Sequence, residues 1–461
     1  CVYETDDTVS LSCDTAMDLL TEDGTGELKE VQTLEPGETL QIAADSTLFE
    51  TANRIYARPQ ALSAKTTVDS ILRNGKTPVY PGNFEIEKTG EGFLLINELA
   101  LEDYLRFVVP SEMPASYPAE ALKAQAVCAR TYAYMHMLHA GLQNYGAHVD
   151  DSAAFLVYNN IAEASETSEA VYETKGQMLL LGGTPVTAYF YSTSCGYGTD
   201  LTAWNLTYGD EMAATGGYLR ARNIAKGQML SDTQNPDAHS SDAQESAEVS
   251  KLAEEDSFAT FIKSADADSF EQEDTYYRWR YDTALDTELL LANLQARYEK
   301  SPGNIQRKKG IGYVDEKPEK LGMVTGLTAV KRTTGGVMTE LLIEGTEDTY
   351  RVCGEQNIRY VLAGENTKIA LGADYGKDGS INGMLPSSFF VIEPVYEADD
   401  GISTEKAKEA PVVISYTLYG GGFGHGIGMS QNAARRMAQA GYDYKQILQF
   451  FYECSIEGVN E

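Results

Sequence analysis

The sequence predicts an α+β protein, in which helices mix with small antiparallel sheets. Three observations carry this prediction. Residues 83–96 show the alternation of a β-hairpin, residues 118–141 show the spacing of an alanine-rich helix, and residues 412–452 show a strand, a glycine-rich turn and two short helices. Strands and helices are thus segregated along the chain, which is the pattern of an α+β fold.

The hairpin prediction rests on two apolar segments around a turn. Asn83–Glu87 alternates between apolar and polar residues, Thr89–Gly92 has the composition of a turn, and Phe93–Ile96 returns as an apolar strand. Residues 37–100 are therefore expected to form a β-rich part. Residues 1–36 are acidic and weakly patterned, and we expect them to be an N-terminal extension or linker.

The helix after Pro118 is predicted from its start, its spacing and its end. Proline is favoured at the first helical position, and Gly141 is a plausible C-terminal stop. An apolar stripe at helical spacing follows Pro118: Leu122, Ala126, Ala129, Ala133 and Met137. Glu112 is expected in the connection just before this helix. It is either a solvated or capping acid, as most glutamates are, or a functional group held by a rigid scaffold.

The C-terminal segment combines a glycine-rich turn with helix caps. The strand 412–419 enters Gly420–Gly428, which lacks the Gly-Lys-Ser/Thr ending of a phosphate loop. Ser430 can cap a helix over 431–440, and Asp443 with Gln446 predicts a capping box for the last helix. Within this segment His425, taken alone, is more typical of a structural residue than of a catalytic one.

The composition limits the classes of function. The chain has 461 residues and a formal net charge of -33, which disfavours nucleic acid and anionic membranes as partners. No apolar run reaches the length of a membrane span. The six cysteines include no C-x-x-C pair, so a zinc finger is not expected. Residues 223–275 are acidic and are expected to be an inserted loop, mostly flexible surface, with one helical piece at 258–264.

Three long motifs, in order, resemble the stage II sporulation protein D family, also called SpoIID/LytB. They are SEMPASYPAEALKAQAVCARTYAY from Ser111, YFYSTSCG from Tyr189 and GGFGHGIGMSQ from Gly421. The resemblance extends over roughly residues 80–452, and we expect residues 101–461 to form the SpoIID-like domain that contains the acidic insert. It implies a fold built around a glycan-binding cleft.

The resemblance also implies a peptidoglycan lytic transglycosylase, which cleaves the bond between N-acetylmuramic acid and N-acetylglucosamine. The muramyl 6-hydroxyl attacks its own anomeric carbon, so a single acid can replace the two carboxylates of ordinary glycosidases. The family places this acid at Glu112. Its pKa should be raised by a partly apolar surface, for which Met113, Pro114 and Tyr117 are candidates.

Further candidate residues follow from the same motifs. The candidates for substrate binding are Ser111, Gln125, Arg130, Ser192, Thr193, Ser194, Trp204, His425, Ser430 and Gln431. The Trp204 indole can stack on a sugar ring or fill the core. Some relatives carry a zinc bound by one His and two Cys near the serine-rich segment, but here Tyr191 and a lone Cys195 occupy that region, so no zinc and no other cofactor is expected. Cys128 and Cys195 are instead a possible disulfide, unless each is a buried thiol.

Two rival functions remain open. LytB-like relatives are described as enhancers of a cell-wall amidase, which would make this chain a peptidoglycan-binding partner without catalysis. A surface adhesin is the third class, suggested by the acidic insert. Each of these readings expects a location outside the cytoplasm, in the cell wall or at the outer face of the membrane. A leader would have been removed, and Cys1 could carry a lipid anchor.

Overall fold

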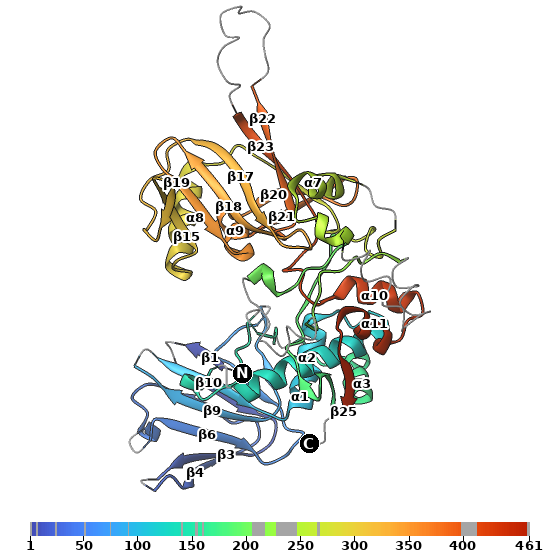
Figure 1. Ribbon diagram of the computed structural model, residues 1–461. Helices are drawn as coiled ribbons and strands as arrows, with labels where there is room; N and C mark the ends of the chain where they lie inside the picture. The colour runs from blue at the N-terminus through green and yellow to red at the C-terminus, as the bar shows by residue number, and fades with distance from the viewer. Residues whose placement is uncertain are drawn as a thin grey trace, which may run out of the picture. The chain divides into compact units, whose positions relative to one another are not determined.

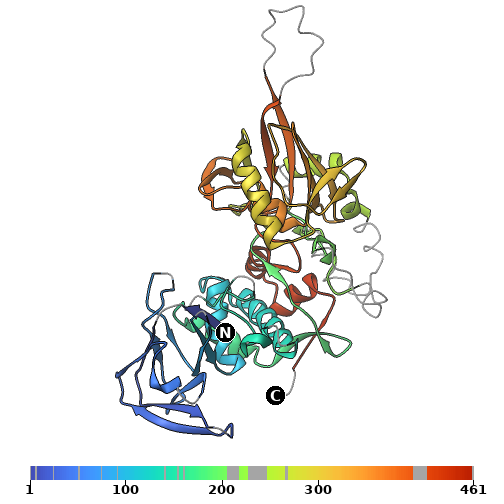
Figure 2. The same ribbon diagram turned by 90° about the vertical axis from the view of Figure 1, so that its left-hand side faces the viewer.

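The computed structural model describes residues 2–5, 8–23, 25–49, 52–73, 75–90, 92–139, 142–152, 155–158, 161–204, 217–226, 247–264, 268–397 and 413–458. The chain divides into two compact units. Unit 1 comprises Cys1–Ala188 and Ser455–Glu461, and unit 2 comprises Tyr189–Cys454. Both units contain helices and small antiparallel sheets, so the predicted α+β class is confirmed (Figure 1, Figure 2). The glycan-binding cleft stays a prediction.

Unit 1 contains three sheets, each held by antiparallel pairing. Their strand orders are β1-β10-β9-β6-β3-β4, β5-β2-β7-β8 and β12-β11-β25. The strands are β1 (Val2–Thr5), β2 (Val9–Cys13), β3 (Met17–Glu22), β4 (Leu28–Leu34), β5 (Thr39–Ile42), β6 (Arg54–Pro59), β7 (Thr66–Val68), β8 (Val79–Tyr80), β9 (Asn83–Lys88), β10 (Phe93–Glu98), β11 (Gln177–Leu181), β12 (Thr184–Pro185) and β25 (Ser455–Gly458). The predicted hairpin is β9–β10, with Phe93 opposite Lys88.

The prediction of an extension at residues 1–36 was wrong. Strands β1 to β4 lie in this segment; β1, β2 and β3 pair with strands from residues 37–100, and β4 pairs with β3. In β2 and β3 the residues alternate between buried and partly exposed positions, with Val9, Leu11, Met17 and Leu19 fully buried. The partly exposed positions are polar in β2 and mixed in β3, where Leu20 lies between Asp18 and Glu22, so the alternation is weak in the sequence.

Three helices of unit 1 pack against one another: α1 (Leu101–Glu112), α2 (Ala119–His139) and α3 (Ser165–Glu173). The amides of Ala121 and Leu122 donate to the Pro118 carbonyl, so α2 starts at the predicted proline. Four residues of the predicted stripe are buried, but Met137 is 41 % exposed, because α2 covers neighbours mainly along its first four turns. Gly141 lies outside the described residues. The predicted domain 101–461 does not coincide with a unit, since α1 to α3 belong to unit 1.

Unit 2 is built on two five-stranded sheets, ordered β21-β20-β14-β23-β22 and β16-β15-β19-β18-β17, and a short parallel pair of β13 with β24. Its strands are β13 (Phe190–Tyr191), β14 (Trp279–Thr283), β15 (Ile305–Lys309), β16 (Gly312–Val314), β17 (Val324–Arg332), β18 (Met338–Gly345), β19 (Thr349–Cys353), β20 (Thr367–Leu371), β21 (Lys377–Ile381), β22 (Phe390–Tyr396), β23 (Val413–Gly420) and β24 (Met429–Ser430). Its α-helices are α7 (Glu255–Lys263), α8 (Thr287–Lys300), α9 (Glu355–Val361), α10 (Gln431–Gln439) and α11 (Tyr444–Phe451). Short 3-10 turns in the chain are Thr47–Phe49 and Gln143–Tyr145 in unit 1 and Leu201–Trp204 in unit 2.

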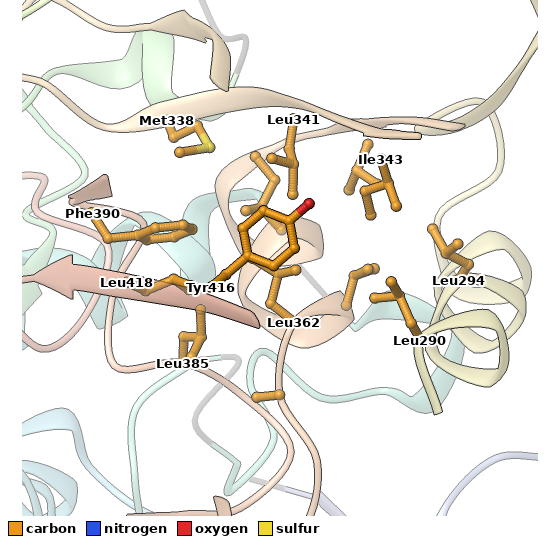
Figure 3. Packing of buried hydrophobic residues seen from close by; sticks show 14 of the residues in the cluster. Leu290, Leu294, Met338, Leu341, Ile343, Leu362, Leu385, Phe390, Tyr416 and Leu418 are labelled. Atoms are coloured by element: carbon orange, nitrogen blue, oxygen red, sulfur yellow. The ribbon is translucent and has the colours of Figure 1, made fainter. Parts of the chain in front are cut away.

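One apolar core joins the two large sheets of unit 2. Figure 3 shows Met338, Leu341 and Ile343 of β18 facing Tyr416 and Leu418 of β23 across the core. Burying such side chains contributes roughly 1.5–3 kcal/mol each, which makes this cluster the main stabilising element of the unit. The helix caps follow the sequence prediction. The Ser430 hydroxyl accepts from the Ala433 amide at α10, and a capping box is present at α11.

The acidic insert at 223–275 is only partly described, since residues 227–246 and 265–267 lie outside the described ranges. Its predicted helical piece is confirmed as α7. The expectation of flexible surface was wrong for α7, because Phe258 and Ile262 are fully buried. Arg332 lies over the Phe258 ring at 4.2 Å and pairs with Glu255 at 2.6 Å. The acidic residues at the start of this helix, Glu254, Glu255 and Asp256, explain why composition alone suggested a loop.

Candidate functional site

Glu112 is the last residue of α1, so the prediction that it stands in a connecting loop was wrong. Pro110 lies inside this helix, although proline lacks the amide that bonds to the preceding turn. The helix nevertheless continues by one turn. The Ser111 hydroxyl donates to the Phe107 carbonyl at 2.7 Å, and the Met113 amide donates to the Val109 carbonyl at 2.9 Å. Glu112 is therefore fixed by helical backbone.

The Glu112 carboxyl is held in a largely buried position. The Val157 amide donates to its Oε1 atom at 2.7 Å. Burial raises the pKa of Glu112 to about 7, although the Val157 hydrogen bond opposes this shift. Two turns earlier on α1, burial and the charge of Glu112 raise the pKa of Tyr104. The carboxyl can therefore carry a proton or release one near neutral pH, as a general acid and base must.

The three residues expected to supply an apolar surface differ in burial. Met113 is buried, Tyr117 is partly buried and Pro114 is exposed. Leu156, next to the residue that bonds Glu112, is buried as well. The raised pKa was thus expected correctly, but Pro114 is too exposed to be a main source of it.

Arg130 is a structural residue of unit 1, so its prediction as a substrate-binding residue was wrong. The side chain has no exposed surface, and its guanidinium forms a bidentate pair with Glu102, with distances of 2.6 and 2.8 Å. It also donates to the carbonyls of Val171 and Gln177. Arg130 therefore ties α2 to α1, α3 and β11. Gln125, on the same helix, is also fully buried.

In unit 2, the residues Ser192–Ser194 follow β13, and a buried carboxylate joins this segment to the start of α10. Glu271 accepts from the Ser194 amide at 2.9 Å, from the Ser194 hydroxyl, and from the Ser430 hydroxyl at 2.6 Å. Burial raises the pKa of Glu271 to about 7, while these donors oppose the shift. Nothing in the sequence marks Glu271, because it stands among other acids in the stretch Glu271–Asp274.

The neighbouring Thr193 is bonded on both sides. It pairs through its backbone with Phe423 of the glycine-rich turn, and its hydroxyl accepts from Asn432 Nδ2 at 2.9 Å. The turn needs glycine at Gly428, where φ is +78° and a Cβ atom would lie 1.9 Å from the Tyr189 carbonyl oxygen. Gln431 begins α10 and is partly buried. The structure thus brings Ser192, Thr193, Ser194 and Ser430 together, but only Ser192 is partly exposed, and their role in substrate binding stays a prediction.

His425 and Trp204 also meet in unit 2, with ring centroids 4.9 Å apart. Trp204 Nε1 donates to Glu355 at 3.3 Å. Burial, assisted by Arg359, lowers the pKa of His425 to about 3. Its Nδ1 accepts from the Ile427 amide at 3.1 Å, which leaves the proton of the neutral ring on Nε2. His425 is therefore a neutral residue that shapes the turn, in line with its reading as a structural residue.

Cys128 and Cys195 are both buried thiols and are not joined in a disulfide. They lie in different units, and Cys195 packs inside its own unit, where its thiol donates to the Tyr197 carbonyl at 3.8 Å. The structure gives no support for the predicted disulfide. The residues also do not fit a zinc. The Tyr191 ring packs on the His425 ring, with centroids 5.7 Å apart. Within the described ranges no three His, Cys, Asp or Glu residues are grouped to hold a metal.

Comparison with known proteins places a family domain around Glu112. Residues 89–181 match SpoIID, described as stage II sporulation protein, and residues 218–428 match a domain of unknown function, DUF8618. The chain therefore carries a SpoIID domain in unit 1. This match supports the resemblance to the SpoIID/LytB family that the motifs predicted. Ser192–Ser194, Trp204, Ser430 and Gln431 lie outside both matched ranges.

Three relatives are similar over different lengths. An amidase enhancer of Bacillus subtilis (strain 168) is 28% identical over 401 residues, which are 87% of this chain and 46% of that protein. An uncharacterised protein of Brachyspira hyodysenteriae is 36% identical over 135 residues, 29% of this chain and 36% of the relative. Stage II sporulation protein D of Bacillus subtilis is 37% identical over 123 residues, 24% of this chain and 36% of the relative. The chain spans less than half the length of these relatives. No helix within the described ranges has the length and apolar character of a membrane span.

Proposed function

We propose that this protein is a peptidoglycan lytic transglycosylase that cleaves the bond between N-acetylmuramic acid and N-acetylglucosamine, with Glu112 as general acid and base. The observation that carries the proposal is the buried carboxyl of Glu112, whose pKa is raised to about 7 within the matched SpoIID domain. An ordinary solvated glutamate would be ionised at neutral pH and could not donate a proton.

The reaction needs two proton transfers through one carboxyl. Protonated Glu112 gives its proton to the glycosidic oxygen as the bond from the muramyl anomeric carbon to that oxygen breaks. The Glu112 carboxylate then takes the proton of the muramyl 6-hydroxyl, whose oxygen forms the new bond to the anomeric carbon. The products are a free 4-hydroxyl on N-acetylglucosamine and a 1,6-anhydro-muramyl end. No water is consumed and Glu112 ends protonated, as it began.

The polypeptide supplies orientation as well as acid chemistry. The Val157 amide fixes one carboxyl oxygen of Glu112, and the helical backbone of α1 fixes its position. The hydrogen bond favours the ionised form, while burial favours the protonated form. Such a balance suits a group that must alternate between both states in one turnover. We propose that the reaction uses no zinc, which a stoichiometric metal assay of the purified protein tests.

A second function is favoured by one specific comparison. The amidase enhancer matches 87% of this chain, whereas stage II sporulation protein D matches 24%. On this account the chain binds peptidoglycan and increases the activity of a cell-wall amidase without cleaving glycan itself. Both functions place the protein outside the cytoplasm, at the cell wall. A lipid anchor at Cys1 falls outside the described residues.

One experiment separates the two functions. The wild-type protein, Glu112→Gln and Glu169→Gln are compared in two assays. The first uses peptide-free glycan strands, and the second uses intact peptidoglycan together with a wall amidase. Glu169 is an exposed residue of α3 and makes the same chemical change at an uninvolved site of unit 1. A transglycosylase cleaves the strands in a Glu112-dependent way. A pure enhancer leaves them intact and stimulates the amidase equally with or without the Glu112 carboxyl.

A further inference from the structure

We propose that Phe423, backed by Tyr276, is a stacking platform for a pyranose ring of the glycan strand, with the Ser192 hydroxyl as the polar contact beside it. The inference rests on the proposed function and adds a saccharide subsite in unit 2. None of the sequence motifs singled out Phe423 or Tyr276 as binding residues. Tyr276 lies within the matched domain of unknown function.

The Phe423 ring is presented by a rigid turn. Its side chain is 36% exposed, whereas Gly421 and Gly422 beside it are buried. The Phe423 amide donates to the Thr193 carbonyl at 2.8 Å, and the Thr193 amide donates back at 3.1 Å. Single exposed apolar residues are common on proteins, but they seldom have both backbone bonds fixed to a second segment. The ring is thus held in place and open to solvent.

The Tyr276 ring packs against the Phe423 ring. The two ring centroids lie 4.6 Å apart with an angle of 49° between the planes. The Gly422 amide donates to the Tyr276 carbonyl at 2.8 Å, which joins the two aromatic residues through the backbone as well. Tyr276 thus packs against part of the Phe423 ring, and the rest of the residue stays exposed to solvent.

A hydroxyl group stands next to this surface. Asn432 Nδ2 donates to Thr193 Oγ1 at 2.9 Å, and Thr193 Oγ1 lies 3.1 Å from Ser192 Oγ. Thr193 is buried, and its hydroxyl can donate a hydrogen bond to the Ser192 hydroxyl. Ser192 is partly exposed, and its hydroxyl can then donate a hydrogen bond to a ligand. Thr193 pairs through its backbone with Phe423, so the Ser192 hydroxyl and the aromatic ring are carried by two segments that are bonded to each other.

This combination fits a neutral sugar better than other ligands. A pyranose has an apolar C–H face that packs on aromatic rings and a rim of hydroxyl groups that needs hydrogen-bonding partners. Within the strand this ring would be N-acetylglucosamine, because N-acetylmuramic acid without its peptide carries a lactyl carboxylate, which the net charge of -33 disfavours. Because Phe423 and Ser192 are uncharged, the subsite offers no ion pair that would select a charged ligand of either sign.

The test measures binding in a protein that cannot consume its ligand. In the Glu112→Gln background, calorimetry is used to titrate peptide-free glycan oligosaccharides into proteins carrying Phe423→Ala, Phe423→Tyr, Ser192→Ala or Ile311→Ala. Ile311 is fully exposed in the turn between β15 and β16, so it controls for loss of an exposed apolar side chain. We expect Phe423→Ala to bind about tenfold more weakly, and Phe423→Tyr and Ile311→Ala to bind like the parent.

Unchanged affinity in Phe423→Ala would overturn the platform, and so would an absence of glycan binding in the parent protein. Unfolding temperatures show whether a weakly binding variant is folded. Phe423→Leu keeps an apolar but non-aromatic side chain, and it must also bind weakly if stacking is the cause. Anhydro-end formation by the wild type is scored separately. If the wild type cleaves glycan and Phe423→Ala keeps full affinity, only the platform is contradicted. If the protein binds glycan without cleaving it, only the proposed catalysis is contradicted.

Discussion

The Val157 amide donates a hydrogen bond to Glu112 Oε1 at 2.7 Å, across a separation of 45 residues in the chain. This contact joins the end of α1 to the segment after α2, and it fixes the carboxyl that we propose as the acid of the reaction. A substitution at Glu112 can therefore have two separate effects. It can remove the acceptor that the Val157 amide needs, or it can remove the proton transfer that the reaction needs.

Glu112→Gln is expected to fold normally and to lose glycan cleavage by about a thousandfold, because the amide side chain still accepts from Val157 but cannot exchange a proton. Turnover of peptide-free glycan and the unfolding temperature are measured together. Glu169→Gln, at the exposed site on α3, should keep wild-type activity. Retained cleavage in Glu112→Gln would exclude Glu112 as the general acid.

The pH dependence of cleavage should report the raised pKa of Glu112. Because the first transfer needs the protonated carboxyl, kcat/KM should fall as pH rises through about 7. The measurement is the pH profile of kcat/KM on peptide-free strands. An inflection at the ordinary glutamate pKa of about 4.3 would show that the reacting acid is a solvated one.

Glu271 should make folding sensitive to pH. Its pKa is raised in the folded state to about 7, so the stabilisation it provides is complete below the unfolded value of 4.5 and is lost as pH rises towards 7. The loss is on the order of 3 kcal/mol. Glu271→Gln cannot ionise, and the Ser194 hydroxyl, which bonds the Oε2 position, can rotate to accept from its amide. We expect this variant to lose less stability than the wild type between these two pH values.

Denaturant unfolding at several pH values measures this difference. The quantity compared is the change in unfolding free energy with pH, wild type against Glu271→Gln, because other carboxylates contribute equally to both proteins. Glu288→Gln, at an exposed position on α8, is the matched control. Parallel curves for wild type and Glu271→Gln would mean that Glu271 does not titrate in this range.

Arg130→Met is expected to destabilise the protein by about 3 kcal/mol, since it leaves Glu102 and two backbone carbonyls without their partner. Arg58→Met replaces an exposed arginine of unit 1 and should have little effect. Unfolding free energy is the measurement for both. At a temperature where the Arg130 variant is folded, its KM should equal that of the wild type. A raised KM with unchanged stability would instead restore a role in substrate binding.

Thiol labelling tests the burial of Cys128 and Cys195. Both should resist alkylation in the native protein and react after unfolding without a reductant, and burial raises the pKa of Cys195 to about 11. Peptide mass spectrometry locates the labels, with the partly exposed Cys353 as an internal reference. A pair that reacts only after reduction would establish the disulfide that the structure lacks.

Sequence reasoning predicted the elements whose signals are local. The alanine-rich helix, the β9–β10 hairpin, the Ser430 cap and the capping box at Asp443 depend on residues close together in the chain, and all are present. The strands of residues 1–36 were missed because they are short and their alternation is weak, with serines between the buried positions of β2 and Asp18 and Leu20 between those of β3. Their pairing partners are distant in the chain, so only tertiary packing reveals them.

The candidate site was predictable where a motif marks a residue and not where burial decides its role. Glu112 and the serine segment were named from motifs, but Arg130 lies in the same motif and is a structural residue. Motif membership cannot separate a side chain that binds substrate from one that holds the helices. Glu271 was missed for the opposite reason, because nothing distinguishes a buried acid from its solvated neighbours in an acidic stretch.

The most direct test of the central claim is the mass of the new glycan ends formed in isotopically labelled water. Attack by the muramyl 6-hydroxyl predicts anhydro-muramyl ends that contain no oxygen from the solvent, formed by the wild type and absent with Glu112→Gln. Reducing ends that carry the solvent oxygen would contradict the account, since they require water as nucleophile and a second carboxylate beside Glu112.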